Sequence, residues 1–162
     1  MRVLILGYRG NPYCGGQGIY IYNLSRELAG LGVYVDVMAG PPYPDPVDEW
    51  AGFYPVENTN IWGVRTKYIP YDKLTRLYSP WNFLDFILTR LRIFPEMETF
   101  SFRSFFALEK ILKQKRYDII HDVQSLGWCT VPMKGYGIPI VTTVHHPLTK
   151  DRESDLAGNF GL

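Results

Sequence analysis

The chain has 162 residues, a length that suits one domain with a hydrophobic core. Its 17 basic and 16 acidic side chains give almost no net charge, so nucleic-acid binding is not indicated. Its two cysteines, Cys14 and Cys129, form neither a disulfide framework nor a zinc site, and they indicate a reducing compartment. No apolar run is long enough for a signal-peptide core or a membrane span, so the sequence predicts one cytoplasmic domain over residues 1–162.

The N-terminal segment predicts a strand, a glycine-rich loop and a helix in immediate succession. The apolar run Val3–Leu6 is too short for a helix, and the loop follows it directly. Apolar residues then recur at helical spacing, at Ile21, Leu24, Leu28 and Leu31. This order brings unpaired backbone N–H groups and the positive end of a helix together, which favours binding of a phosphate.

The spacing of the loop glycines excludes two common nucleotide-binding motifs. The five glycines between Gly7 and Gly18 do not fit G-x-G-x-x-G, and no Lys followed by Ser or Thr completes a P-loop. Two interpretations stay open: a backbone cradle for a phosphate, or a tight turn in which glycine only allows the bend. The position after the first strand favours the cradle, because alternating α/β sheets bind ligands at the carboxyl ends of their strands.

The rest of the chain alternates between strand and helix patterns. Gly30–Gly32 ends the first helix, a second strand covers Val33–Met38, and four prolines predict a loop or insertion from Gly40 to Asn60. The further elements expected are a weak strand over 61–64, helices through Phe83–Phe94 and Phe102–Leu112, and strands over Asp118–His121 and Ile140–Val144. Short apolar strands separated by helices predict an α/β fold, a Rossmann-like parallel sheet with helices on both faces.

Polar residues and glycines gather where three of the predicted strands end. The first strand is followed by Gly15, Gly16 and Gln17, the fourth strand segment ends at His121 and is followed by Asp122, Gln124 and Ser125, and the last is followed by His145 and His146. Because the carboxyl ends of parallel strands meet at one edge, these groups are expected to converge on one cleft. A lone histidine is usually a hydrogen-bonded structural residue, but all three histidines of the chain lie at this predicted edge, which favours a ligand site.

Three motifs occur in order and cover nearly the whole chain. Asn11–Leu31 contains the paired glycines and the apolar helical stripe, Tyr117–His121 is an Asp-apolar-apolar-His strand, and Gly137–His145 is a Gly-Ile-Pro strand that ends in Thr-x-His. Each motif is weak alone, but jointly they are fairly specific. Together they resemble the N-terminal domain of the family 4 retaining glycosyltransferases, which have the GT-B fold.

The resemblance implies that the chain is the acceptor-side half of an enzyme that transfers a hexose from a nucleotide sugar with retention of configuration. It implies no metal and no cofactor besides the nucleotide-sugar substrate. Catalytic contacts would come from His121 and Asp122, and donor or acceptor contacts from Gly15, Gly16, Gln17, Gln124, His145 and His146. The family often has a second histidine where Val123 stands, which leaves the sugar contact open among His121, Asp122 and Gln124. The C-terminal donor-binding domain is absent from this sequence, so the chain alone is expected to be inactive.

Two other functions stay open. One is a non-catalytic Rossmann-like module that binds a phosphorylated ligand through the glycine loop. The other is a membrane-associating interaction domain, because basic residues between Lys73 and Arg103 are interleaved with aromatic residues between Trp81 and Phe102, as in an interfacial helix. Ordinary packing of an aromatic helix face on the sheet explains the same pattern.

Overall fold

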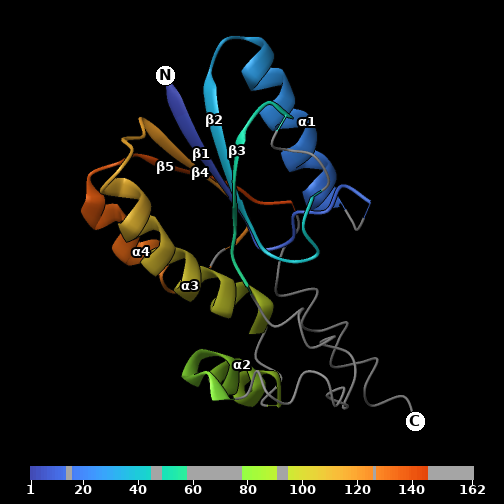
Figure 1. Ribbon diagram of the computed structural model, residues 1–162, viewed down its shortest axis with the longest axis vertical. Helices are drawn as coiled ribbons and strands as arrows, with labels where there is room; N and C mark the ends of the chain where they lie inside the picture. Colours follow the sequence, from blue (N-terminus) through green and yellow to red (C-terminus); the bar gives the residue numbers. More distant parts are fainter. Residues whose placement is uncertain (14–15, 45–48, 58–77, 91–94, 126, 146–162) are drawn as a thin grey trace.

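The computed structural model describes residues 1–13, 16–44, 49–57, 78–90, 95–125 and 127–145. In these residues one sheet lies between helices on its two faces (Figure 1). The strands are β1 (Arg2–Gly7), β2 (Tyr34–Ala39), β3 (Gly52–Pro55), β4 (Ile119–Val123) and β5 (Ile140–Thr143). The helices are α1 (Gly16–Gly30), α2 (Pro80–Arg90), α3 (Pro95–Leu112) and α4 (Thr130–Met133), the last followed by a 3₁₀ turn over Lys134–Tyr136.

The five strands form one parallel sheet in the order β3–β2–β1–β4–β5. The central strand β1 pairs with β2 from Arg2 opposite Tyr34, and with β4 from Val3 opposite Ile119. The chain adds strands outward from β1 to β3 and then returns to the other side of β1, so the strand order reverses between β1 and β4. In open α/β sheets, this reversal marks the crevice where ligands bind. The architecture confirms the predicted Rossmann-like fold class.

Alternate residues of β1 contribute to two separate hydrophobic cores. Val3 and Ile5 pack in the core that α1 covers, whereas Leu4 and Leu6 pack with Phe100 of α3 in the other. Successive side chains of a strand point to opposite faces, so a strand that is buried on both faces is a continuous apolar run in the sequence. Figure 1 accordingly shows α1 and α3 on opposite sides of the sheet.

The helix boundaries follow local signals in the sequence. α1 ends at Gly30, and Gly32 adopts a left-handed φ of 78° while the N–H of Val33 donates to the carbonyl of Leu28. Both α2 and α3 begin with a proline, which is favoured at the first helical position because its missing N–H would have no partner there. The predicted helix through Phe83–Phe94 corresponds to α2 as far as Arg90; residues 91–94 lie outside the described residues.

The predicted loop from Gly40 to Asn60 was wrong, because the edge strand β3 lies inside it. β3 has four residues and ends at Pro55, and proline is tolerated in a strand only at a sheet edge, where no neighbour needs its N–H. A strand this short, with a proline as its last residue, shows no usable alternation of apolar residues. The weak strand predicted at 61–64 lies outside the described residues, and the short helix α4 was not predicted at all.

Candidate active site at the carboxyl edge of the sheet

Gln17 connects the first turn of α1 to the carboxyl ends of β1 and β4. Its Oε1 accepts a hydrogen bond from the N–H of Arg9 at 3.0 Å, and its Nε2 donates to the carbonyl oxygen of Val123. Both ends of the side-chain amide therefore bind backbone groups of the protein. The structure uses this predicted ligand-binding residue to hold the helix start against the edge of the sheet.

The two described histidines lie together at this edge. His121 is on β4, and its Nε2 is 2.8 Å from Oγ1 of Thr143, the last residue of β5. Tyr20 of α1 packs edge-on against both imidazoles, with ring centroids 6.0 Å from His121 and 5.0 Å from His145. The Tyr20 hydroxyl also lies 3.4 Å from the same Thr143 Oγ1. Residues from α1, β4 and β5 thus form one cluster, which we call the His121–Thr143–Tyr20 cluster.

The surroundings of His121 favour its neutral form. Burial is the main influence and lowers its pKa below the ordinary value; the charge of Asp122 opposes this shift, and His145 adds to it. A neutral imidazole has one donor and one acceptor nitrogen. Nε2 faces Thr143, while Nδ1 has no hydrogen-bond partner among the residues that the structure describes. Nδ1 can therefore form one hydrogen bond with a hydroxyl group of a ligand.

Asp122, the second residue predicted to be catalytic, is fully buried on the opposite face of the sheet from His121. Its Oδ1 accepts a hydrogen bond from the N–H of Ser125 at 3.1 Å, and Oδ2 accepts one from the hydroxyl of Thr142 at 3.5 Å. The carboxylate therefore organises the loop after β4. The structure does not bring Asp122 together with the imidazole of His121.

Gln124 links the loops that follow β4 and β5. Its backbone has a left-handed φ of 49°, which is uncommon for a residue with a side chain, and its side chain is buried. Its Oε1 accepts a hydrogen bond from the N–H of His145 at 2.7 Å. Such conformations persist only where the surroundings enforce them, and they are enriched at functional sites. Gln124 thereby sets the position of the His145 backbone.

The glycines at the start of α1 differ in how closely other atoms approach them. A Cβ at Gly18 would overlap the carbonyl oxygen of Asn11, so this glycine lets the loop backbone lie directly on the helix. Gly16, the first residue of α1, is exposed, its φ is not left-handed, and no described heavy atom would lie within 4 Å of an added Cβ. Within the part of the chain that the structure describes, the space beside Gly16 is open at the positive end of the helix. The predicted site residues Gly15 and His146 lie outside the described residues.

Sequence reasoning missed Tyr20, Thr143 and an ion pair between the glycine loop and α3. Arg9 Nη2 lies 2.7 Å from Glu96 Oε2, in the first turn of α3. Thr143 belongs to the Thr-x-His motif, so its place two residues before His145 was the one available signal. No sequence signal pointed to Tyr20 or Arg9, because their partners are distant along the chain.

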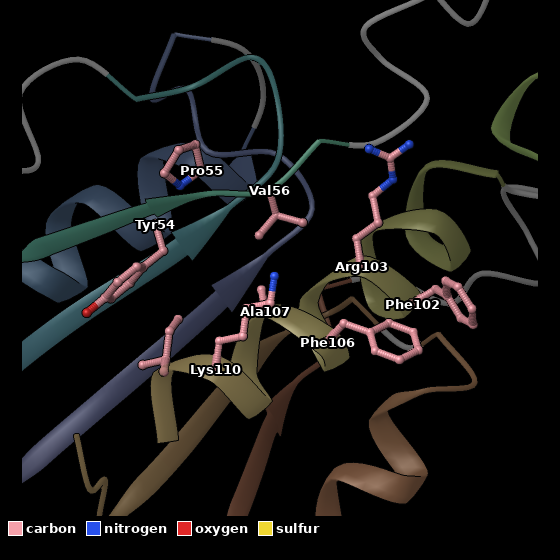
Figure 2. Close-up of a pocket in the computed structure, with 9 residues that line it drawn as sticks. Tyr54, Pro55, Val56, Phe102, Arg103, Phe106, Ala107 and Lys110 are labelled. Carbon is pink, nitrogen blue, oxygen red and sulfur yellow. The ribbon is translucent and has the colours of Figure 1, made fainter. Parts of the chain in front are cut away.

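A groove of about 400 Å³ lies elsewhere, between β3 and α3 (Figure 2). Its walls are Tyr54, Pro55 and Val56 on one side and Phe102, Arg103, Phe106, Ala107, Lys110 and Ile111 on the other. Arg103 binds Glu57 at 3.0 Å and Asn82 at 2.6 Å, so its charge is already paired. None of the predicted site residues lines this groove. Its walls are mostly apolar and offer no converging set of catalytic groups.

The aromatic residues that suggested a membrane-associating domain lie partly in the interior and partly on the surface. Phe100 is fully buried under the sheet, whereas Phe83 of α2 is 52% exposed. No helix within the described residues is both long and apolar enough to cross a membrane. The same residues contain no group of three or more His, Cys, Asp or Glu side chains that could hold a metal ion.

Two comparisons with known proteins, a sequence profile and a curated relative, indicate a glycosyltransferase. The sequence profile of Glycosyltransferase Family 4 matches residues 14–159. An MMP alpha-(1->4)-mannosyltransferase from Mycolicibacterium hassiacum is 36% identical over 160 residues, which cover 97% of this chain and 38% of that protein. The crystal structure of CalG4, the calicheamicin glycosyltransferase, aligns with a TM-score of 0.50 at 17% identity over 95% of this chain and 37% of that one, a likeness in fold alone.

The C-terminal domain of PF1911 hydrogenase from Pyrococcus furiosus aligns with a TM-score of only 0.49 at 13% identity, over 88% of this chain and 90% of that one. The chain spans less than two fifths of the length of the mannosyltransferase and of CalG4. The profile match covers most of the chain and includes all or part of each of the three motifs. It confirms the resemblance that they indicated: the chain belongs to glycosyltransferase family 4.

Proposed function

We propose that this chain is the acceptor-side domain of a retaining glycosyltransferase that moves a hexose from a nucleotide sugar to an acceptor. The observation that carries the proposal is the convergence of the α1 N-terminal end, His121 and His145 at the edge where the strand order reverses. Family membership supplies the class of reaction. The name of the mannosyltransferase relative makes nucleotide-activated mannose the first donor to test.

The proposed roles follow from the chemistry of each group. The N–H groups in the first turn of α1, which have no acceptor within the helix, and the positive helix end stabilise negative charge on the diphosphate or acceptor. Neutral His121 uses its unbound ring nitrogen to hydrogen-bond a hydroxyl of the transferred sugar, and His145 borders the same space. Gln17, Asp122 and Gln124 act indirectly, because their side chains accept hydrogen bonds from backbone N–H groups around the cleft.

The test uses the full-length polypeptide that carries this sequence, supplied with nucleotide sugars and a panel of acceptors. We expect release of the nucleotide to depend on acceptor, and NMR of the product to show the same anomeric configuration as the donor. His121→Ala should lower kcat/KM roughly a hundredfold, within the range of one positioned polar group. Tyr22→Phe, on the other side of α1 against Trp50, should leave it unchanged.

Three outcomes would contradict the proposal. Tight binding of a phosphorylated ligand with no turnover in the full polypeptide would favour the binding module. Flotation with lipid vesicles and no binding of nucleotide sugar would favour the membrane-associating domain. Full transfer by residues 1–162 alone would contradict the expectation that a second domain supplies part of the donor site.

A further inference from the structure

We infer that Tyr20 and Thr143 are positioning residues that select the tautomer of His121, through a hydrogen-bond chain that places the imidazole proton on Nδ1. The chain runs from the Tyr20 hydroxyl to the Thr143 hydroxyl and on to Nε2 of His121. The inference rests on the proposed function only in its last step, where Nδ1–H is offered as a donor to an oxygen of the sugar substrate.

The first step is the shared oxygen of Thr143. Oγ1 lies 2.8 Å from Nε2 of His121 and 3.4 Å from the oxygen of Tyr20, so one hydroxyl serves both partners. A threonine hydroxyl has a single hydrogen and two lone pairs. The phenol is the more acidic of the two hydroxyl groups, so it donates to Thr143 Oγ1. The hydrogen of Thr143 then points to Nε2, and each bond of the chain polarises the next.

The second step is the charge state of the imidazole. A neutral ring that accepts at Nε2 must carry its proton at Nδ1. Within the described residues, the charged and titratable groups around the ring are Asp122, His145 and Tyr20. The carboxylate of Asp122 is bound to Ser125 and Thr142 on the opposite face of the sheet, so it does not compete with Thr143 for the ring. Burial keeps the ring neutral.

The third step is the restraint on ring orientation. Tyr20 meets His121 at an interplanar angle of 85° and His145 at 77°, so one aromatic edge limits the rotation of both imidazoles. Thr143 is fixed in turn by the pairing of β5 with β4, where it lies opposite Val123. The direction in which Nδ1–H points is therefore set by α1 and β5 rather than by β4 alone.

The experiment is NMR of the full-length polypeptide labelled with ¹⁵N-histidine, with the His121 signal assigned by its loss in His121→Asn. The nitrogen shifts and the two-bond couplings to the ring protons report which nitrogen carries the proton. We expect His121 with Nδ1 protonated near neutral pH. Thr143→Val, which keeps the branched shape, should move the population toward Nε2–H, and Thr143→Ser should restore it. Tyr20→Phe, which keeps the ring contact, should give a smaller shift in the same direction.

A wild-type His121 with its proton on Nε2 would overturn the inference, and so would a tautomer that does not change in Thr143→Val. Tyr22→Phe is the matched control on the same helix and should leave the His121 signal unchanged. In kinetics, Thr143→Val should lower kcat/KM roughly tenfold and Thr143→Ser should recover most of it. If the tautomer changes while transfer does not, the positioning of His121 is upheld and the role of His121 in the proposed function is refuted.

Discussion

Two polar clusters lie at opposite ends of the sheet and differ in how completely their hydrogen-bonding capacity is used. At the amino end, the buried carboxylate of Asp36 is bound by Lys115 Nζ at 3.0 and 3.2 Å and by the Tyr117 hydroxyl at 2.6 Å. At the carboxyl end, the His121–Thr143–Tyr20 cluster consists of neutral groups. One nitrogen of its imidazole has no partner among the described residues.

This difference in unused hydrogen-bonding capacity distinguishes a cluster that stabilises the fold from one that is a candidate for binding a ligand. In the amino-end cluster, opposite charges meet, and burial together with the neighbouring Asp36 raises the pKa of Tyr117 far above its ordinary value, so the phenol stays a donor. Each group there already has a strong internal partner, and such a cluster contributes to stability. The carboxyl-end cluster joins neutral groups, and one ring nitrogen of His121 has no partner within the described residues. Burial of polar residues alone does not distinguish the two; the remaining capacity for hydrogen bonds does.

Among the variants that test this comparison, Asp36→Ala is expected to have the largest effect on stability. Removing the carboxylate leaves the buried hydroxyl of Tyr117 without its acceptor, whereas Lys115 is exposed enough to turn to water. We expect a loss of about 3 kcal/mol in the free energy of unfolding, measured with denaturant, and unchanged transfer by the folded enzyme. Asp118→Ala is the control. Within the described residues this exposed carboxylate accepts a hydrogen bond only from the N–H of Arg2, so its removal should lower the free energy of unfolding by under about 1 kcal/mol. Equal losses would contradict the structural role of the cluster.

The second prediction tests the carboxyl edge through Gly16→Val. The branched side chain would occupy the space where the diphosphate or acceptor is expected, so transfer should fall roughly a hundredfold, as when one preorganised oxyanion donor is lost. Because the φ of Gly16 is not left-handed and no described atom would lie within 4 Å of an added Cβ, the melting temperature should change little. Gly30→Ala, at the other end of α1, should leave turnover almost intact. Normal transfer by Gly16→Val would show that this loop does not face the reacting groups.

A third prediction compares two glycines of the same helix. Gly18→Ala places a methyl group against the carbonyl oxygen of Asn11, and overpacking of this kind should cost about 2 kcal/mol of stability. Gly30→Ala meets no described atom within 4 Å and should be neutral or slightly stabilising. Thermal unfolding of the two variants measures the difference. Similar melting temperatures would mean that the loop does not lie against α1 as described.

The smallest expected effect is a pH dependence of stability that arises from His121. Its folded pKa is lowered by burial, so between that value and the ordinary value of about 6.5 the unfolded chain binds more protons than the folded one. Stability from this group is complete above about pH 6.5 and decreases as the pH falls toward the folded pKa. Unfolding measured at about pH 7.5 and about pH 5.5 should therefore show a smaller difference in His121→Gln than in the wild type. An identical difference in the two proteins would refute a neutral, half-buried His121.

Local patterns determined much of this fold. The apolar runs of β1, β2, β4 and β5, most of the helical stripe of α1 and the glycine stop at its end are properties of neighbouring residues, so the sequence sufficed to predict them. The exception is Leu31, the last residue of the predicted stripe, which lies beyond the end of α1 at Gly30 and is 79% exposed. The strand-end rule then placed His121 and His145 at one edge. β3 was missed because an edge strand of four residues with a terminal proline has neither alternation nor length.

Only the tertiary structure decided which polar groups pair with one another. Asp36 and Tyr117 are 81 residues apart, and Tyr20 and Thr143 are 123 apart, so no local spacing connects them. Asp122 and His121 are adjacent in the chain, yet the pleat of β4 sends them to opposite faces, one enclosed and one at the cleft. The sequence by itself determined the elements and the edge at which polar residues gather, because both depend on local periodicity and strand direction. Partner choice depends on distances between separate strands and helices, which exist only once the sheet and its two helical layers have assembled.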